Sequence, residues 1–151
     1  MADPAVTKKP LRSRGKSPGR TLPARSTAKV PPAAVNLLAA ALKVFDQAAT
    51  GMGLDVPARL KILNLGRSKY FGLRAQAEPE LDVDRRDRLG YFLAIYELSG
   101  RLVGSPGDWL KSPNRAPQFA GQPPLERVLG GRMEDLIITL AYLKGAYGGW
   151  A

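Results

Sequence analysis

The sequence of 151 residues contains no cysteine and no histidine. The lack of cysteine excludes disulfide bonds, thiolate metal sites and a cysteine nucleophile. The lack of histidine removes the commonest general base, the commonest side-chain metal ligand and every catalytic pair in which histidine activates a serine or cysteine. An enzyme of this composition would depend on carboxylates, lysines, tyrosines and hydroxyls. We therefore expect no enzyme activity, no catalytic residue, no metal site and no cofactor.

Long apolar runs are also missing. The apolar run within residues 135–143 is far shorter than the roughly 20 residues that a membrane span needs. The N-terminus is basic, but no apolar segment follows it as a secretory signal would require. The sequence therefore predicts a soluble, cytoplasmic protein without a membrane partner.

Positive charge is abundant but unevenly distributed. Of the formal net charge of +10, residues 1–31 contribute eight Lys and Arg against Asp3 alone, or +7. Residues 1–32 are also rich in Pro, Ser and Thr and poor in large apolar residues, a composition typical of disorder. Two interpretations of this predicted basic tail remain open: an arm that binds DNA phosphates, or a solvated leader.

The rest of the chain has the periodicity of helices. Val35, Leu38, Leu42, Phe45 and Ala49 recur in steps of three and four, which places them on one face of a helix between the Pro31-Pro32 pair and Gly51 or Gly53. Further helices are predicted over about 55–63, 67–75, 82–103, 108–111 and 133–146, and a short one is opened by Pro123 and Pro124. Asp55 is the expected N-cap of the first of these, and residues 78–80 are a predicted break before the helix over 82–103. No run of alternating apolar and polar residues is long enough to predict a β-strand. The predicted fold class is all-α.

The helix predicted over 82–103 is expected to begin with Asp82 as its N-cap. Leu89, Phe92, Leu93, Tyr96 and Gly100 are predicted on its inner face. Its first turns are predicted to form a solvated surface of mixed charge, made of Asp84, Arg85, Arg86, Asp87 and Arg88. Because acidic groups at a helix start favour the macrodipole, capping explains these carboxylates more simply than catalysis.

The second and third predicted helices, over 55–63 and 67–75, are joined by a turn at residues 64–66. They have the lengths and spacing of a helix-turn-helix. The third helix would enter the major groove of DNA. The candidate DNA-binding residues on it are Arg67, Ser68, Lys69, Tyr70 and Arg74. Tyr70 is expected either to pack or to touch a sugar, and the alternative for the whole motif is a scaffold that only packs or dimerises.

The C-terminal part contains the order Trp109-Leu110, Pro113-Asn114, Gly121-Gln122-Pro123-Pro124-Leu125 and a terminal helix with Gly145. In this order the sequence resembles the MbcA/ParS/Xre antitoxin family over about residues 35–151. The motif residues themselves are expected to act mainly in folding, with Trp109 and Leu110 anchoring a turn and Gly130 and Gly131 ending a helix in the left-handed conformation.

The resemblance implies an antitoxin whose partner is a RES-domain toxin that consumes NAD. It also implies that the C-terminal end obstructs the toxin's active-site cleft, that the protein forms a homodimer within a larger complex, and that it represses its own operon by binding operator DNA. On this basis we divide the chain into the tail (1–32), an Xre-like helix-turn-helix region (33–80) and a helical region for dimerisation and toxin binding (81–151).

The terminal helix carries the candidate toxin-binding surface. Leu136, Ile137, Leu140 and Leu143 are predicted to face the core, and Gly145 to begin the end of the helix. The candidate toxin-binding residues are Tyr142, Lys144, Tyr147, Gly148, Gly149 and Trp150. For Trp150, anchoring in a partner's pocket and folding back on its own domain remain alternatives. For the whole chain, the alternative function is a free-standing helix-turn-helix transcription regulator.

Overall fold

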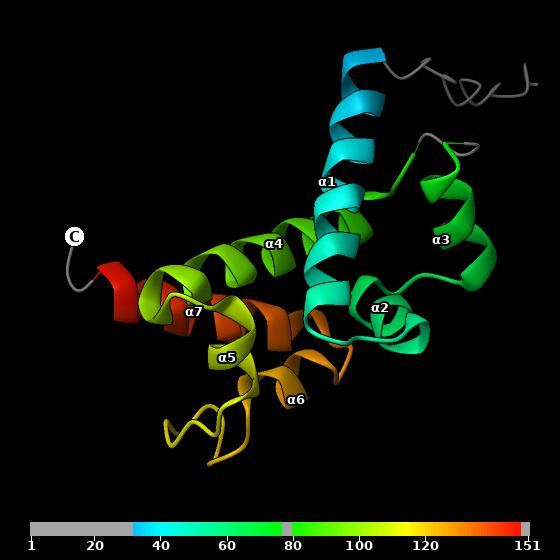
Figure 1. Cartoon of the computed structure of the whole chain (residues 1–151). Coiled ribbons are helices and arrows are strands. Elements are labelled where there is room, and N and C mark those ends of the chain that lie inside the picture. The colour runs from blue at the N-terminus through cyan, green and yellow to red at the C-terminus, as the bar shows by residue number, and fades with distance from the viewer. Residues whose placement is uncertain (1–31, 77–79, 149–151) are drawn as a thin grey trace, which may run out of the picture.

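The computed structural model describes residues 32–76 and 80–148 (Figure 1). Within these ranges the chain is helical and has no strand, so the all-α prediction is confirmed. The elements are α1 (Pro32–Gly51), α2 (Val56–Leu63), α3 (Arg67–Arg74), α4 (Val83–Val103), α5 (Pro106–Lys111), α6 (Pro124–Val128) and α7 (Met133–Gly148). The predicted tail, except for Pro32, lies outside the described residues. So do residues 78 and 79 of the break predicted before α4.

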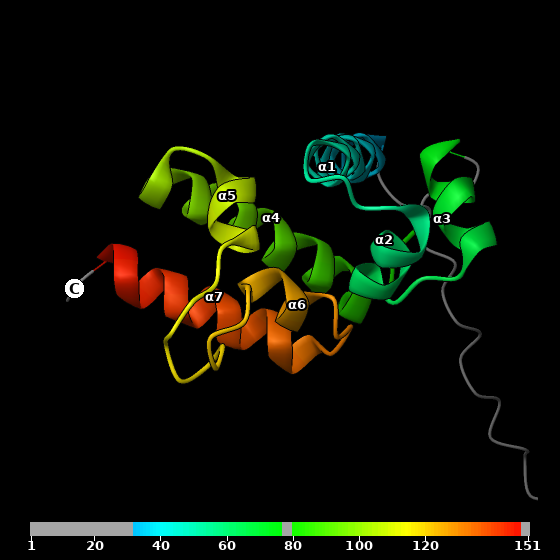
Figure 2. The same cartoon turned by 60° about the horizontal axis from the view of Figure 1, so that its bottom comes forward.

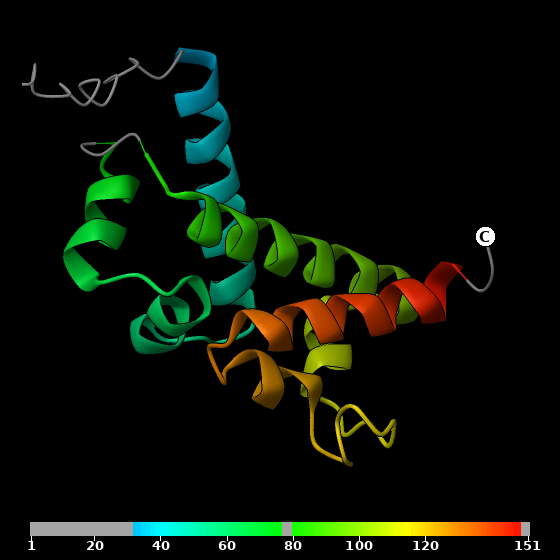
Figure 3. The same ribbon diagram turned by 180° about the vertical axis from the view of Figure 1, so that it is seen from behind.

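The two long helices α4 and α7 lie side by side and run in the same direction (Figures 2 and 3). At their start Arg88 of α4 donates to the carbonyl of Gly131 just before α7, and at their end the Arg101 guanidinium lies 5.8 Å from the Tyr147 ring centroid. The helix α1 packs against α4, while α3 lies at the edge of the molecule away from the end of α7. The two proposed functional regions are therefore at opposite ends.

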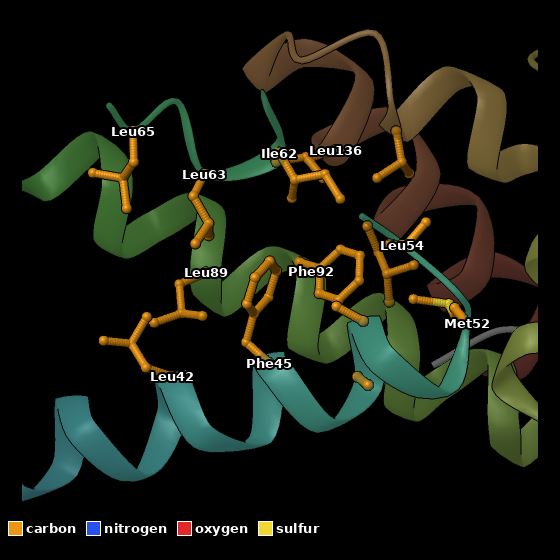
Figure 4. Packing of buried hydrophobic residues seen from close by; sticks show 14 of the residues in the cluster. Leu42, Phe45, Met52, Leu54, Ile62, Leu63, Leu65, Leu89, Phe92 and Leu136 are labelled. Carbon is orange, nitrogen blue, oxygen red and sulfur yellow. The ribbon is translucent and has the colours of Figure 1, made fainter. Parts of the chain in front are cut away.

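The core joins α1 and α2 to α4 and α7 (Figure 4). The predicted α1 stripe is present: Leu42, Phe45 and Ala49 are buried and Leu38 is half-buried, whereas Val35 lies outside the described side chains. The rings of Phe45 and Phe92 meet edge to face with centroids 5.0 Å apart. The buried cluster also contains Ile62, Leu63, Leu89 and Leu136. Residues of both predicted helical regions thus share one cluster.

Side-chain caps fix two helix starts as predicted. The Asp55 carboxylate accepts a hydrogen bond of 2.9 Å from the backbone N–H of Ala58, and the Asp82 carboxylate accepts one of 3.0 Å from the N–H of Arg85. These bonds occupy donors that have no partner inside the helix. The Arg85 backbone bond also lowers the pKa of Asp82, despite opposing desolvation, and the Arg85 side chain adds to the effect. The caps set the starts of α2 and α4.

The predicted inner face of α4 is correct only in part. Leu89 and Phe92 are buried, but Leu93 and Tyr96 are half-buried. Fully buried Ile95 and Ser99 were missed, because α4 is covered on more than one side by α1, α5 and α7. None of the described helices is long and apolar enough to span a membrane.

The prediction that Arg88 is solvated is wrong. Only 7% of Arg88 is exposed, because its Nε donates to Asp84 at 2.9 Å and its Nη1 donates to the Gly131 carbonyl at 2.9 Å. A charged side chain tolerates such burial when hydrogen bonds replace water. Arg88 is therefore a connection between α4 and the start of α7.

Two expectations for α7 are corrected. Ile137 is 46% exposed, because Asp135 and Thr139 instead take buried positions beside Leu136 and Leu140. Gly145 does not end the helix, which continues to Gly148 and includes Tyr147. Intrahelical hydrogen bonding and the neighbouring α4 outweigh the roughly 1 kcal/mol that glycine costs within a helix.

Candidate functional site

The helix-turn-helix segment has the predicted turn. Asn64 closes α2 in the left-handed conformation, with φ 51° and ψ 47°, and its backbone N–H points at the carbonyls of Leu60 and Lys61. Gly66 then precedes the first turn of α3 in an extended conformation. The Arg85 Nε donates to the Asn64 carbonyl at 2.8 Å and ties the turn to the first turns of α4. Hydrogen bonds to both α2 and α4 thus hold the turn in place.

The aspartate at position 46 on α1 holds α2 and α3 together. Its carboxylate accepts a hydrogen bond from the Tyr70 hydroxyl and lies 2.8 Å from Arg74 Nε and 3.4 Å from Arg59 Nη1. The Arg59 guanidinium also donates to the Leu54 carbonyl at 3.0 Å. We refer to Asp46, Arg59, Tyr70 and Arg74 as the Asp46 cluster. It joins three helices around one carboxylate.

Tyr70 packs inward, so only the first of its two expected roles is realised. The side chain is completely buried, and its ring meets that of Phe71 at a centroid distance of 5.3 Å. Burial raises the pKa of the Tyr70 hydroxyl, and the hydrogen bond to Asp46 raises it further. Tyr70 therefore positions α3 and cannot itself reach a nucleic acid.

The other candidate residues of α3 do not all lie on one side. Arg67 and Ser68 are exposed, whereas Lys69 is half-buried and lines a hollow with Asp82 and Arg85 at the start of α4. Arg74 is 43% exposed at its side chain while its Nε contacts Asp46. The candidates at 67–70 are consecutive, and four consecutive residues span more than one turn of a helix. They therefore cannot share a face.

The outward face of α3 includes a residue that the sequence reasoning missed. Phe71 is 37% exposed and lies between Arg67 and Arg74, whose guanidinium carbons are 5.2 Å and 5.8 Å from its ring centroid. We call Arg67, Ser68, Phe71 and Arg74 the outer α3 face. A helical projection of residues 67–74 identifies it, since positions 67, 71 and 74 fall together while 70 and 73 point to the core.

A groove of about 700 Å³ lies between α1 and α3 and extends to Arg59 of α2. Asp46, Arg59 and Arg74 of the Asp46 cluster line it, together with Lys43, Gln47 and Thr50. Its charged lining residues are the cations Lys43, Arg59 and Arg74 and the anion Asp46, so the groove has a net positive charge. In the part of the chain that is described, no group of acidic residues has the arrangement of a metal site.

The aromatic residues of the C-terminal part form one small cluster. Trp109 stacks on Tyr142 with centroids 6.1 Å apart, and both rings meet Phe119 edge to face at 6.0 Å and 5.1 Å. Phe119 is buried and Trp109 and Tyr142 are half-buried, while the neighbouring Leu110 is fully buried. Tyr142 therefore holds the preceding loop against α7, and its side chain stays partly exposed.

That loop, residues 112–123, is closed by its own hydrogen bonds. The Asn114 N–H donates to the Gln122 carbonyl at 3.2 Å, and the Gly121 N–H donates to the Asn114 carbonyl at 2.9 Å. The Asn114 side chain accepts from the N–H of Ala116 at 2.9 Å. The Pro-Asn and Gly-Gln motifs thus meet in space, and their folding role is evident in these bonds.

The helix α6 is fastened to α7 by charge. Arg127 Nε lies 3.0 Å from Asp135 Oδ1, and Arg127 Nη1 donates to the carbonyl of Gln118 in the loop. Of the two glycines expected in the left-handed conformation, only Gly131 adopts it, with φ +77°, and Gly130 does not. The loop, α6 and the start of α7 therefore form a fixed unit.

The end of the α4–α7 pair exposes two large side chains within the described residues. Val103 is 53% exposed and Tyr147 is 50% exposed, and Lys144 is exposed one turn before Tyr147, whereas the exposed Ile137 lies nearer the start of α7. We call Val103, Lys144 and Tyr147 the α4–α7 end surface. Gly148 is exposed at the last described position, whereas the candidates Gly149 and Trp150 lie outside the described residues.

No protein-family model matches the chain, and no curated protein matches it significantly.

Proposed function

We propose that this protein is the antitoxin of a type II toxin–antitoxin pair. In this proposal it is a stoichiometric protein inhibitor and not an enzyme. Its C-terminal region binds and inhibits a RES-domain toxin that consumes NAD, and its helix-turn-helix binds operator DNA and represses its own operon. It acts in the cytoplasm as a homodimer within the toxin–antitoxin complex.

The observation that carries the inhibitor role is the α4–α7 end surface. Val103 and Tyr147 are about half exposed although both are large apolar side chains at the ends of neighbouring helices. Their burial by a partner would release apolar surface from water at about 25 cal/mol per Å². Aromatic residues in such positions are common anchors of protein interfaces. The surface also leads directly into Gly149, Trp150 and Ala151 of the sequence.

The observation that favours DNA binding is the outer α3 face. Arg67 and Arg74 lie on it with Ser68, and α3 is at the edge of the molecule where a duplex could approach (Figures 1 and 2). Arginine and serine are frequent donors to phosphate oxygens, and arginine also reads guanine. Its position at the other end of the molecule from the α4–α7 end surface allows DNA and toxin to be bound together.

Co-expression with the neighbouring open reading frame tests the antitoxin role. We expect that the neighbour alone stops bacterial growth and depletes NAD, and that this protein restores both. A neighbour that is harmless alone, or toxic regardless of this protein, contradicts the proposal.

The interface is tested by truncation and substitution. Removal of Gly148 to Ala151 should abolish neutralisation while the helical circular dichroism and the oligomeric mass stay unchanged. Tyr147→Ala and Val103→Ser should each weaken toxin binding by about tenfold or more, as expected for interface anchors. Val44→Ser is the matched control, since Val44 is 48% exposed on α1. A truncated protein that still neutralises fully contradicts this placement.

A free-standing transcription regulator is the second candidate, favoured by the same outer α3 face. It predicts repression of promoters elsewhere and no toxin partner. Co-purification separates the two, because only the antitoxin should retain the product of the neighbouring gene at a fixed stoichiometry.

A further inference from the structure

The outer α3 face has an aromatic ring at its centre. Phe71 is not needed in the core, where Tyr70 and Leu73 of the same helix are already buried. Its ring is held from three sides: Arg67 lies one turn before it, Arg74 one turn after it, and Tyr70 contacts it edge to face. Such contacts limit the orientations open to the ring, which stays 37% exposed.

The outer α3 face carries two kinds of side chain that could contact DNA. Arg67 and Arg74 are cationic donors suited to phosphate oxygens on either side of a groove. Phe71 has no hydrogen-bonding group, so it cannot read the donors and acceptors of base edges. In the major groove the one apolar feature that distinguishes base pairs is the 5-methyl group of thymine, and phenylalanine is among the side chains that contact it.

We propose that Phe71 is a specificity-determining residue that recognises a thymine methyl group in the major groove, with Arg67 and Arg74 placed on the flanking phosphates. This inference rests on the proposed DNA-binding function and deepens it. The Asp46 cluster supports the recognition, because it attaches Tyr70 and Arg74 to α1 and thereby fixes the direction in which Phe71 projects.

The test uses DNA selected by the full-length protein. Duplexes are enriched from a random pool on the wild-type chain, and the strongest is resynthesised with each thymidine in turn replaced by deoxyuridine, which removes only the methyl group. At one position in each half-site we expect the Kd of the wild type to rise about fourfold, as for the loss of one buried methyl group.

Variants assign the effect to the side chain. Phe71→Ala should bind the thymine and uracil duplexes equally, whereas Phe71→Leu should keep a reduced preference for thymine. Val44→Ala, an exposed apolar position on α1, should keep the full preference. The Leu variant also preserves an apolar side chain should the Ala variant fold poorly.

The outcomes distinguish the two levels of the proposal. If no duplex is enriched, DNA binding and the role of Phe71 both fail. If a duplex is enriched but no uracil replacement changes wild-type binding, or if Phe71→Ala retains the sensitivity, DNA binding stands and the methyl readout is overturned. Loss of toxin binding in Phe71→Ala with unchanged DNA binding would assign this face to a protein interface and also overturn the inference.

Discussion

Asp46 is the residue through which polar contacts attach α2 and α3 to α1. Its one carboxylate receives Tyr70 and Arg74 from α3 and Arg59 from α2. Since α3 packs mainly on α1, these bonds and the burial of Leu73 largely determine how α3 is held.

Replacing Asp46 by Asn removes the charge and leaves two arginines without their counter-ion. A hydrogen bond to a charged group contributes about 1.5–3 kcal/mol. We expect the free energy of unfolding to fall in total by about the contribution of one such bond. Urea denaturation followed by circular dichroism measures it. Asp87→Asn, an exposed carboxylate on α4, is the control and should change little. Equal stability of the two variants would show that the Asp46 cluster does not hold α3.

Tyr70 should make stability dependent on alkaline pH. Burial and Asp46 raise the pKa of its hydroxyl above the ordinary value of 10.0, so the unfolded chain loses this proton at a lower pH than the folded chain. The free energy of unfolding should therefore fall as the pH rises above about 10. Tyr70→Phe should be less stable at neutral pH but should lack the part of this decline that depends on the hydroxyl. Parallel pH profiles for both proteins would contradict the prediction.

At the scale of elements, the junction between α6 and α7 depends on close approach to α2. Gly131 and Gly104 have nearly the same left-handed φ, +77° and +78°. A Cβ at Gly131 would lie 2.8 Å from Lys61 Cγ and 3.2 Å from the Lys61 carbonyl oxygen, whereas one at Gly104 would meet nothing within 4 Å. The two glycines therefore separate backbone strain from steric contact.

Gly104→Ala should cost about 1–2 kcal/mol, the strain of a left-handed alanine. Gly131→Ala should cost more, since its Cβ displaces Lys61 and disturbs the hydrogen bond from Arg88 to the Gly131 carbonyl. Thermal unfolding of both variants gives the comparison. A Gly131 variant no less stable than the Gly104 variant would mean that the junction adjusts freely.

Helix positions could be predicted from sequence because periodicity and caps are local. Asp55, Asp82 and the left-handed Asn64 all mark ends that the structure confirms. The burial of a side chain, in contrast, depends on residues that are far away along the chain. Arg88 is buried where the Gly131 carbonyl, far along the chain, joins Asp84 in accepting its hydrogen bonds. Ile137 is exposed because Thr139 and Asp135 occupy the side of α7 facing its neighbours.

The candidate DNA-binding residues illustrate the same limit. Arg67 and Ser68 are exposed as a binding role requires, but the helix directs Lys69 and Tyr70 elsewhere and exposes Phe71 instead. The aromatic contacts of Tyr142 with Trp109 and Phe119 required the path of the intervening loop, which periodicity does not predict. Trp150 lies outside the described residues, so its two alternatives stay open.

For the molecule as a whole, charge is divided between the tail and the rest. Residues 1–31 carry +7 of the net +10. If they form an arm on DNA, deletion of these residues should reduce the slope of log Kd against log salt concentration by about 0.9 for each DNA phosphate that the arm neutralises. Fluorescence anisotropy with a labelled duplex at several salt concentrations measures the slope. An unchanged slope would favour a solvated leader.

The closed loop of residues 112–123 also bears on how a protease would meet this protein. Arg115 offers trypsin an exposed cleavage site, but a protease binds its substrate as an extended segment. Extending this one requires breaking the bonds of Asn114 with Gly121 and Gln122 and withdrawing Phe119 from its aromatic partners. Cleavage after Arg115 would therefore report local opening of the C-terminal part, and its rate would measure how firmly the loop is held against α7.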